Sequence, residues 1–145
     1  MILIDANLLI YAYDASSEFH ERARAWLEGT FSSGRPIRLS WSTVHAFLRL
    51  TTHAAIFQRP FSMREAVEIV ESWLALSTVD LLEPGAAYWT IFRQLLDKSQ
   101  IRGPLVMDAH LAALAIEHGA ILHSADRDFL RFGGLRVVNP LARAS

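Results

Sequence analysis

Short apolar runs alternate with longer segments of helical periodicity along this chain. Four of the runs have the length and continuous hydrophobic character of strands buried in a parallel sheet. They are residues 1–4, 79–82, 120–123 and 135–138. Residues 38–41 could form one further brief strand. The alternation predicts a single three-layer α/β/α domain over residues 1–145, with a short and mostly parallel central sheet.

The segments between these runs carry apolar residues at intervals of three and four, as on one face of a helix. We expect helices over residues 6–13, 19–31, 43–50, 62–74, 84–96 and 104–118. Ser62 and Glu65 form a capping-box signature. Ser42 or Thr43 is expected to cap the preceding helix, and Pro84 to open the following one.

Composition narrows the setting in which such a domain would work. The chain has no cysteine and is 52% hydrophobic, so we expect packing, and not disulfides or thiolate-bound metal, to hold the fold. The first residues, MILID, lack the basic segment of a secretory signal, and no apolar run approaches the roughly 18 residues that span a bilayer. We therefore expect a cytoplasmic protein with no membrane partner.

Charge and aromatic content bear on possible partners. The net charge is −1 and Lys98 is the only lysine, which is unlike proteins that hold nucleic acid through a broad basic surface. Any RNA contact would be local and made by arginines. We expect Trp26, Trp73 and Trp89 in the core or in a protein interface. Trp41, near a predicted strand end, is the best candidate for stacking on an unpaired base.

Aspartates follow the predicted strands at the edge where an open α/β sheet binds its ligands. Asp5 directly follows the first strand, and Asp126 and Asp128 follow the strand that ends at residue 123. Asp108 lies near the start of the helix 104–118. Converging carboxylates repel one another by about 4 kcal/mol per close pair at an effective dielectric near 20, so a cation is needed. Oxygen ligands of this kind suit Mg²⁺ or Mn²⁺.

An acidic site with such a cation suits hydrolysis of a phosphodiester, because the cation activates water and stabilises charge on the leaving oxygen. We expect Asp108 to stay ionised readily, since the helix dipole favours negative charge at a helix start. Ser124 could hydrogen-bond a carboxylate or a water. Each acid also has a simpler interpretation: Asp5 and Asp126 as caps of helical turns, and Asp108 as a favourable first-turn charge.

Three stretches, MILIDANLLIYAYD, MDAHLAALAIEHGAILHSADRDF and LRVVNPL, resemble the PIN-domain family, and in particular the VapC-type ribonuclease toxins of type II toxin–antitoxin systems. The resemblance covers essentially the whole chain, in order. It implies a PIN-like domain that acts as a metal-dependent endoribonuclease on RNA such as tRNA or rRNA. It further implies a homodimer that a VapB-like antitoxin neutralises.

The resemblance also implies roles for the acids. Asp5 is similar to the first metal-ligating acid of the family, and Asp108 to its principal later one. Asp126 corresponds to the acid of the family's Thr/Ser-x-Asp element, and Asp128 to an additional acid two residues on. We therefore expect all four to be catalytic, with Mg²⁺ or Mn²⁺ bound by Asp5, Asp108 and Asp126.

Substrate contacts are expected from four further residues. Asn7 matches a polar residue at the mouth of the family's pocket, and Ser124 lies between strand and acids. Arg127 could hold the RNA backbone, because guanidinium binds phosphate in a bidentate manner. Arg49 is open to two interpretations, a phosphate contact or an ordinary ion pair.

One position departs from the family pattern. A glutamate three residues before Arg49 is usual, and Ala46 stands there instead. His45 could compensate, although its spacing need not direct it to the same place. We expect a structural role for His110, and we expect His118 and His123 to be exposed or hydrogen-bonded, since water activated by a metal needs no histidine base.

Two other functions remain open from sequence. The missing acid at Ala46 is compatible with a PIN domain that has lost catalysis and binds RNA or a protein partner. A haloacid-dehalogenase-like phosphatase would use Asp5 as its nucleophile, with Asn7 in the partner position. That chemistry needs a lysine near the phosphate, and Lys98 is the sole candidate.

Overall fold

Five parallel strands form one sheet at the centre of the molecule, in the order β3-β2-β1-β4-β5. The computed structural model describes residues 1–143. The strands are β1 (Ile2–Ile4), β2 (Ile37–Leu39), β3 (Val79–Leu81), β4 (Ile121–His123) and β5 (Val137–Val138). Each lies within a residue or two of its predicted position. The described sheet is entirely parallel, where sequence predicted a mostly parallel one.

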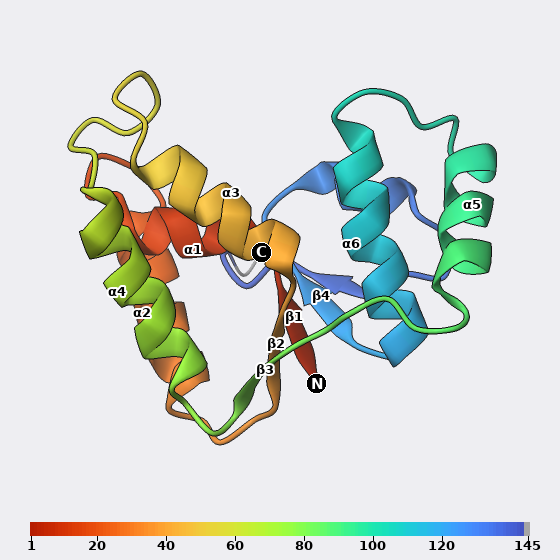
Figure 1. Cartoon of the computed structure of the whole chain (residues 1–145), viewed down its shortest axis with the longest axis horizontal. Coiled ribbons are helices and arrows are strands. Elements are labelled where there is room, and N and C mark those ends of the chain that lie inside the picture. Colours follow the sequence, from red (N-terminus) through yellow and green to blue (C-terminus); the bar gives the residue numbers. More distant parts are fainter. Residues whose placement is uncertain (144–145) are drawn as a thin grey trace.

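Helices cover both faces of this sheet. They are α1 (Ala6–Tyr13), α2 (His20–Phe31), α3 (Trp41–Thr51), α4 (Met63–Leu74), α5 (Tyr88–Lys98) and α6 (Leu105–His118), with a 3-10 turn η1 (Arg127–Arg131) after β4. In Figure 1, α1 to α4 lie on one side of the strands and α5 and α6 on the other. The predicted three-layer α/β/α arrangement is confirmed.

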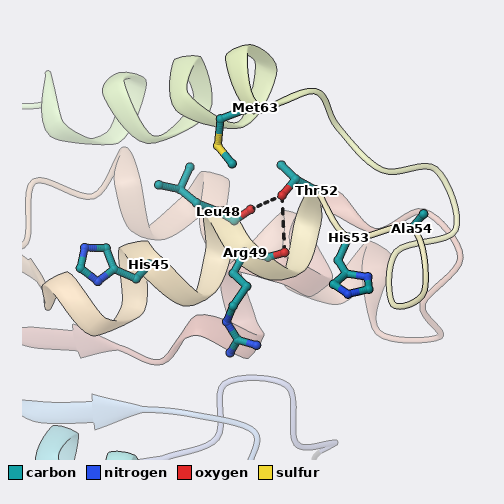
Figure 2. Close-up of a pocket in the computed structure, with 7 residues that line it drawn as sticks. All are labelled: His45, Leu48, Arg49, Thr52, His53, Ala54 and Met63. Carbon is teal, nitrogen blue, oxygen red and sulfur yellow. Dashed lines mark hydrogen bonds between the residues drawn. The ribbon is translucent and has the colours of Figure 1, made fainter.

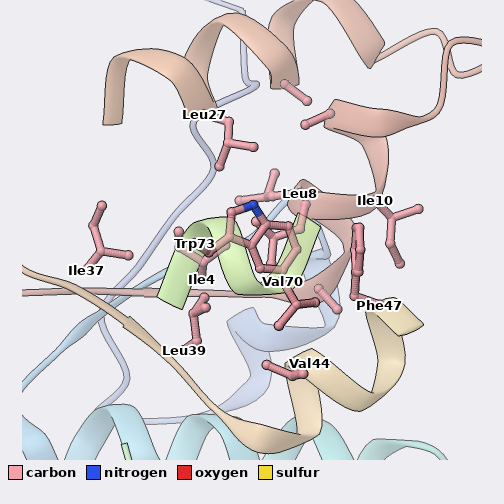
Figure 3. Packing of buried hydrophobic residues seen from close by; sticks show 14 of the residues in the cluster. Ile4, Leu8, Ile10, Leu27, Ile37, Leu39, Val44, Phe47, Val70 and Trp73 are labelled. Atoms are coloured by element: carbon pink, nitrogen blue, oxygen red, sulfur yellow. The ribbon is translucent and has the colours of Figure 1, made fainter. Parts of the chain in front are cut away.

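The central strand shows how the pattern of residues divides the core. Ile2 and Ile4 pack into the cluster formed with α1 to α4, whereas Leu3 between them packs into the cluster formed with α5 and α6. Successive side chains of a strand point to opposite faces, so one buried strand serves both layers. Figure 3 shows the first cluster, in which Phe47 and Trp73 meet edge to face with ring centroids 4.7 Å apart.

Two predicted helix starts are wrong, the first for a local reason and the second because of a contact distant in sequence. Ser40, not Ser42 or Thr43, caps α3, since its side chain accepts a hydrogen bond from the Thr43 N–H at 3.1 Å. Trp41 is consequently the first residue of a helix and not the end of a strand.

Helix α5 begins at Tyr88, later than Pro84 predicted. Glu117 of α6 accepts hydrogen bonds from the N–H groups of Gly85 and Ala87, at 2.8 and 3.0 Å, and so holds the preceding segment in a non-helical conformation. Within residues 1–143, no helix has both the length and the apolar character needed to cross a bilayer.

Candidate active site

The carboxyl edge of the sheet brings together residues from the two ends of the chain. Strands β1 and β4 are parallel neighbours, with Ile4 paired to His123. The backbone N–H of Asp5 continues this pairing by donating to the His123 carbonyl at 3.0 Å. Asp5 and Ser124 therefore leave the sheet side by side, although they are 119 residues apart in sequence.

The Ser124 hydroxyl ties these two segments together. Its Oγ donates to Asp5 Oδ2 at 2.7 Å and accepts from the Asp126 N–H at 2.9 Å. Asp126 Oδ1 in turn accepts from the Asp128 N–H at 2.8 Å and so caps η1. The predicted carboxylate contact of Ser124 is confirmed. Asp5 occupies the N-cap position of α1, as the simpler interpretation predicted, but its side chain makes no capping hydrogen bond and contacts Ser124 instead.

Three carboxylates form the tightest acidic group. One oxygen each from Asp108, Asp126 and Asp128 lies within 4.8 Å of the other two, a spacing close to that of oxygens that share one hard cation. Asp5 lies outside this triad but lines one pocket together with Asp108 and Asp126. The structure thus brings the four predicted acids to one place. Which of them bind a metal remains a prediction.

The electrostatics of the site show a need for positive charge. Burial, and after it the negative carboxylates of Asp126, Asp5 and Asp128, together raise the pKa of Asp108 to about 6, against a smaller lowering by Arg131. Burial also raises the pKa of Asp5, with the Ser124 hydrogen bond opposing it. The expectation that the helix dipole keeps Asp108 readily ionised is therefore wrong, because burial and like charges outweigh the dipole.

A divalent cation fits this donor set. The ligands on offer are carboxylate oxygens, which hard cations such as Mg²⁺ and Mn²⁺ prefer. Burial first, and the neighbouring carboxylates after it, raise the pKa values of Asp5 and Asp108, and a bound cation would oppose both effects. Arg131 compensates only in part, since it contacts Asp128 at 3.4 Å on the exposed side of the group.

The pocket in front of the acids measures about 450 Å³. The start of α1 forms its floor, with Asp5 and Asn7. Helix α6 contributes Asp108 and Met107 on one side, and helix α3 forms the opposite wall. The α3 residues that line it are Trp41, Ser42, Thr43, His45, Ala46, Arg49 and Leu50.

Two of the four predicted substrate-binding residues, Asn7 and Arg49, line this pocket. Ser124 does not line it but reaches it indirectly, through its hydrogen bond to Asp5. Arg127 does not line it; this exposed residue lines a smaller hollow of about 80 Å³ on the other side of Asp126. A role for Arg127 in holding RNA at the acids therefore lacks structural support.

The α3 wall carries the departure from the family pattern. Ala46 lines the pocket, so a glutamate at this position would face the acids, and the wall has no carboxylate. His45 also lines the pocket, next to Trp41. Met107 was missed by sequence reasoning, and its place directly before Asp108 is the only signal that could have found it.

A second hollow, of about 600 Å³, lies on the outer side of α3 (Figure 2). It is lined by His45, Leu48, Arg49, Thr52, His53, Ala54 and Met63. Figure 2 shows the Arg49 side chain extending away from Met63 and α4. No carboxylate lines this hollow, so it offers no comparable metal site.

His110, expected to be structural, and His118, expected to be exposed or hydrogen-bonded, both make hydrogen bonds. His110 Nδ1 lies 2.6 Å from the Tyr88 hydroxyl, and His118 Nε2 lies 2.9 Å from the Glu83 carbonyl. The expectation is wrong for His123, whose buried Nδ1 has no hydrogen-bond partner within residues 1–143. Its ring stacks on Trp26, and burial lowers its pKa to about 4, so it is neutral at physiological pH.

The structure does not support the haloacid-dehalogenase-like phosphatase, because the lysine that this chemistry needs lies away from the site. Lys98 is exposed at the end of α5 and does not line the acidic pocket. The Asp5 carboxylate, which would have to attack phosphorus, is held by Ser124 among other acids. The site therefore favours metal chemistry over a phosphoaspartate.

Comparisons with known proteins agree with this arrangement. A family profile described as "PIN domain" matches residues 2–135. Ribonuclease VapC37 of Mycobacterium tuberculosis is 39% identical over 98% of this chain and 99% of its own. Among solved structures, VapBC2 from Rickettsia felis, bound to a promoter DNA fragment, aligns with a TM-score of 0.69 at 16% identity, over 96% of this chain and 98% of that chain.

A second solved structure with a similar fold is that of VapC20 of Mycobacterium tuberculosis, described as a toxin that cleaves the sarcin-ricin loop. It has a TM-score of 0.67 and 18% identity, over 94% of this chain and 99% of that chain. The two solved structures show likeness of fold, whereas the profile and VapC37 show descent. The chain belongs to the PIN-domain family and, within it, to the VapC proteins.

Proposed function

We propose that this protein is an endoribonuclease that hydrolyses RNA phosphodiester bonds at an Mg²⁺ or Mn²⁺ site, and that it is the toxin of a VapBC-type pair. The observation that carries the proposal is the convergence of Asp5, Asp108 and Asp126 on one pocket, with the pKa of Asp108 raised to about 6. The chain's likeness to VapC37, a protein named as a ribonuclease, supports RNA as the substrate.

In this proposal Asp5, Asp108 and Asp126 hold the cation, and Asp128 completes the acidic group. When bound, the cation supplies a Lewis acid that activates water and stabilises charge on the phosphate oxygens. Ser124 fixes the Asp5 carboxylate through its 2.7 Å hydrogen bond, and Asp126 is fixed by its contact with the Asp128 N–H. Asn7 and Arg49, at the walls of the pocket, orient the RNA backbone.

Partners follow from the relatives. The Rickettsia felis structure contains VapBC2, a toxin with its antitoxin. We therefore expect a small VapB-like antitoxin to bind this chain and block the acidic pocket. We also propose that residues 1–145 form a single domain and that the active form is a homodimer, whose interface uses some of the chain's four tryptophans and eight phenylalanines.

The test uses protein purified free of antitoxin and incubated with total RNA and Mn²⁺ or Mg²⁺. The unaltered protein is expected to cut RNA, and Asp5→Asn to leave it intact. Asp97→Asn is the matched control, because Asp97 is an exposed aspartate on α5 outside the acidic pocket. Cleavage that persists in Asp5→Asn, or none by any of the three proteins with either metal, would contradict the proposal.

A second candidate function rests on Ala46. With no carboxylate on the α3 wall, the pocket could bind RNA or a partner without cutting. RNA that binds the unaltered protein in the presence of Mn²⁺ and stays intact would favour this candidate over the nuclease.

A further inference from the structure

Three side chains on successive turns of α3 form a stripe beside the acids. Trp41, His45 and Arg49 are four residues apart, so they lie above one another on the same helical face. All three are exposed, and all three line the acidic pocket. We call these three residues the α3 stripe. It spans about 12 Å along the helix.

The N-terminal end of the α3 stripe, at Trp41, is an exposed aromatic surface. The Trp41 ring is inclined by 29° to the His45 ring, with centroids 6.4 Å apart, and Trp41 is 45% exposed. The Ser40 cap fixes Trp41 at the first position of α3. Across the pocket on α6, Met107 is 55% exposed. Two large apolar side chains thus stand uncovered on either side of the opening, as suits a flat apolar group bound between them.

The C-terminal end of the α3 stripe, at Arg49, carries a positive charge. Within residues 1–143 the Arg49 guanidinium is in no ion pair, and Figure 2 shows its side chain extending away from α4. A guanidinium can bind phosphate with two parallel hydrogen bonds. The two ends of the stripe therefore present the two chemistries of a nucleotide strand, an aromatic surface for a base and a cation for the backbone.

We propose that the α3 stripe positions the substrate strand, with Trp41 stacking on a base next to the scissile phosphate and Arg49 binding a neighbouring backbone phosphate. The proposal rests on the proposed ribonuclease function, to which it adds a positioning element. Unpaired bases are commonly read by stacking on aromatic side chains. A chain with a net charge of −1 cannot hold RNA through general attraction, so a local element of this kind is required.

The test separates base contacts from backbone contacts. Binding is measured by fluorescence anisotropy in an Asp5→Asn background, which prevents cleavage. The probes are a labelled oligoadenylate and an abasic oligoribonucleotide of the same length, which carry the same phosphates. Trp41→Ala is expected to weaken oligoadenylate binding about tenfold and to change abasic binding by less than about twofold. Trp41→Phe should keep most of the affinity.

Two further variants complete the design. Arg49→Ala is expected to weaken both probes equally and to reduce the dependence of log Kd on log salt by about one. Trp89→Ala is the matched control, because Trp89 is 62% exposed but lies on α5 outside the pocket, and it should change neither affinity. Circular dichroism confirms that each variant is folded.

The outcomes distinguish the proposal for the α3 stripe from the proposed ribonuclease function on which it rests. If Trp41→Ala weakens both probes equally, or neither, Trp41 stacks on no base and the proposal is overturned. The stripe would then be left to a protein partner such as an antitoxin. RNA cleavage by the otherwise unaltered protein is followed in parallel. Loss of the base effect in a protein that cleaves RNA overturns the stripe alone, whereas a base effect in a protein that cleaves nothing overturns the nuclease alone.

Discussion

The two sides of the acidic pocket differ in how their side chains are held. Where β1 and β4 end, Asp5, Ser124 and Asp126 are joined by hydrogen bonds of 2.7 to 2.9 Å. On α3, Trp41 and Arg49 are exposed and carry no such bonds within residues 1–143. Catalytic groups need a preorganised geometry, whereas a surface that holds a flexible strand can be adaptable. The contrast supports our proposals that the side at β1 and β4 performs the chemistry and that α3 positions the substrate.

The largest expected effect comes from breaking the fixed side. Asp126→Asn is expected to lower RNA cleavage by more than about 100-fold, beyond the 10–100-fold typical of residues that only orient a metal ligand. Asp128→Asn should cost less, because Asp128 is exposed and partly neutralised by Arg131. Initial cleavage rates at saturating Mn²⁺ check both. Equal losses of cleavage rate in the two variants would show that Asp126 and Asp128 contribute equally, against what their placement indicates.

Ser124 tests whether the hydrogen bonds themselves matter. Ser124→Ala removes the contact that holds Asp5 to the segment of Asp126, and should weaken Mn²⁺ binding about 30-fold while all four carboxylates remain. Ser124→Thr keeps a hydroxyl and is expected to recover most of the affinity. Calorimetric titration with Mn²⁺ measures this. An alanine variant that binds Mn²⁺ as tightly as the unaltered protein would remove Ser124 from the account.

A carboxylate introduced on α3 would make the two sides of the acidic pocket more alike. Ala46→Glu places a carboxylate on the α3 wall, facing the acids, and should tighten Mn²⁺ binding about tenfold, because affinity for hard cations rises with the number of charged oxygen ligands. Ala46→Gln adds a side chain of the same length without the charge. The metal concentration that gives half-maximal cleavage should fall for glutamate and stay unchanged for glutamine.

The smallest effect concerns stability without metal. In the folded protein the pKa of Asp108 is about 6, above its ordinary 3.8, so the folded state binds the proton more tightly than the unfolded state. This stabilisation is complete below pH 3.8 and is lost as pH rises through about 6. At about pH 8, metal-free Asp108→Asn is expected to be about 1 kcal/mol more stable than the unaltered protein, a value reduced by solvent screening.

Urea denaturation with a chelator, at acid and at alkaline pH, measures this difference. Added Mn²⁺ should reverse the order, because a cation that binds only the folded state stabilises the unaltered protein. If the variant is not the more stable protein at alkaline pH, burial and the neighbouring acids do not disfavour the charged form of Asp108 as the geometry implies.

Some of the structural features behind these predictions could be predicted from the sequence, and others could not. The meeting of Asp5 with Asp126 was predictable, because one apolar run ends directly at Asp5, another ends shortly before Asp126, and neighbouring parallel strands finish at one edge. The capping box at Ser62 is also local, and it was found. The start of α5 was not predictable, since it depends on Glu117, which lies about 30 residues farther along the chain.

Side-chain direction and electrostatics were the harder part of the site. Nothing in the sequence distinguished Arg49 from Arg127. Arg49 lines the acidic pocket, whereas Arg127 lines another hollow. The raised pKa of Asp108 depends on burial and on three charges brought together by the fold. Trp41 was noticed as an aromatic residue near a strand end, but only the Ser40 cap explains why it stands at the opening of the pocket.

Direct titration of Mn²⁺, followed by electron paramagnetic resonance on antitoxin-free protein, tests most directly whether distant aspartates share one ion. We predict that the unaltered chain and Asp97→Asn bind Mn²⁺ with the same affinity. Binding should be lost or strongly weakened in Asp5→Asn, Asp108→Asn and Asp126→Asn. Equal affinity in all five proteins would mean that the pocket holds no metal, and would contradict the account at its centre.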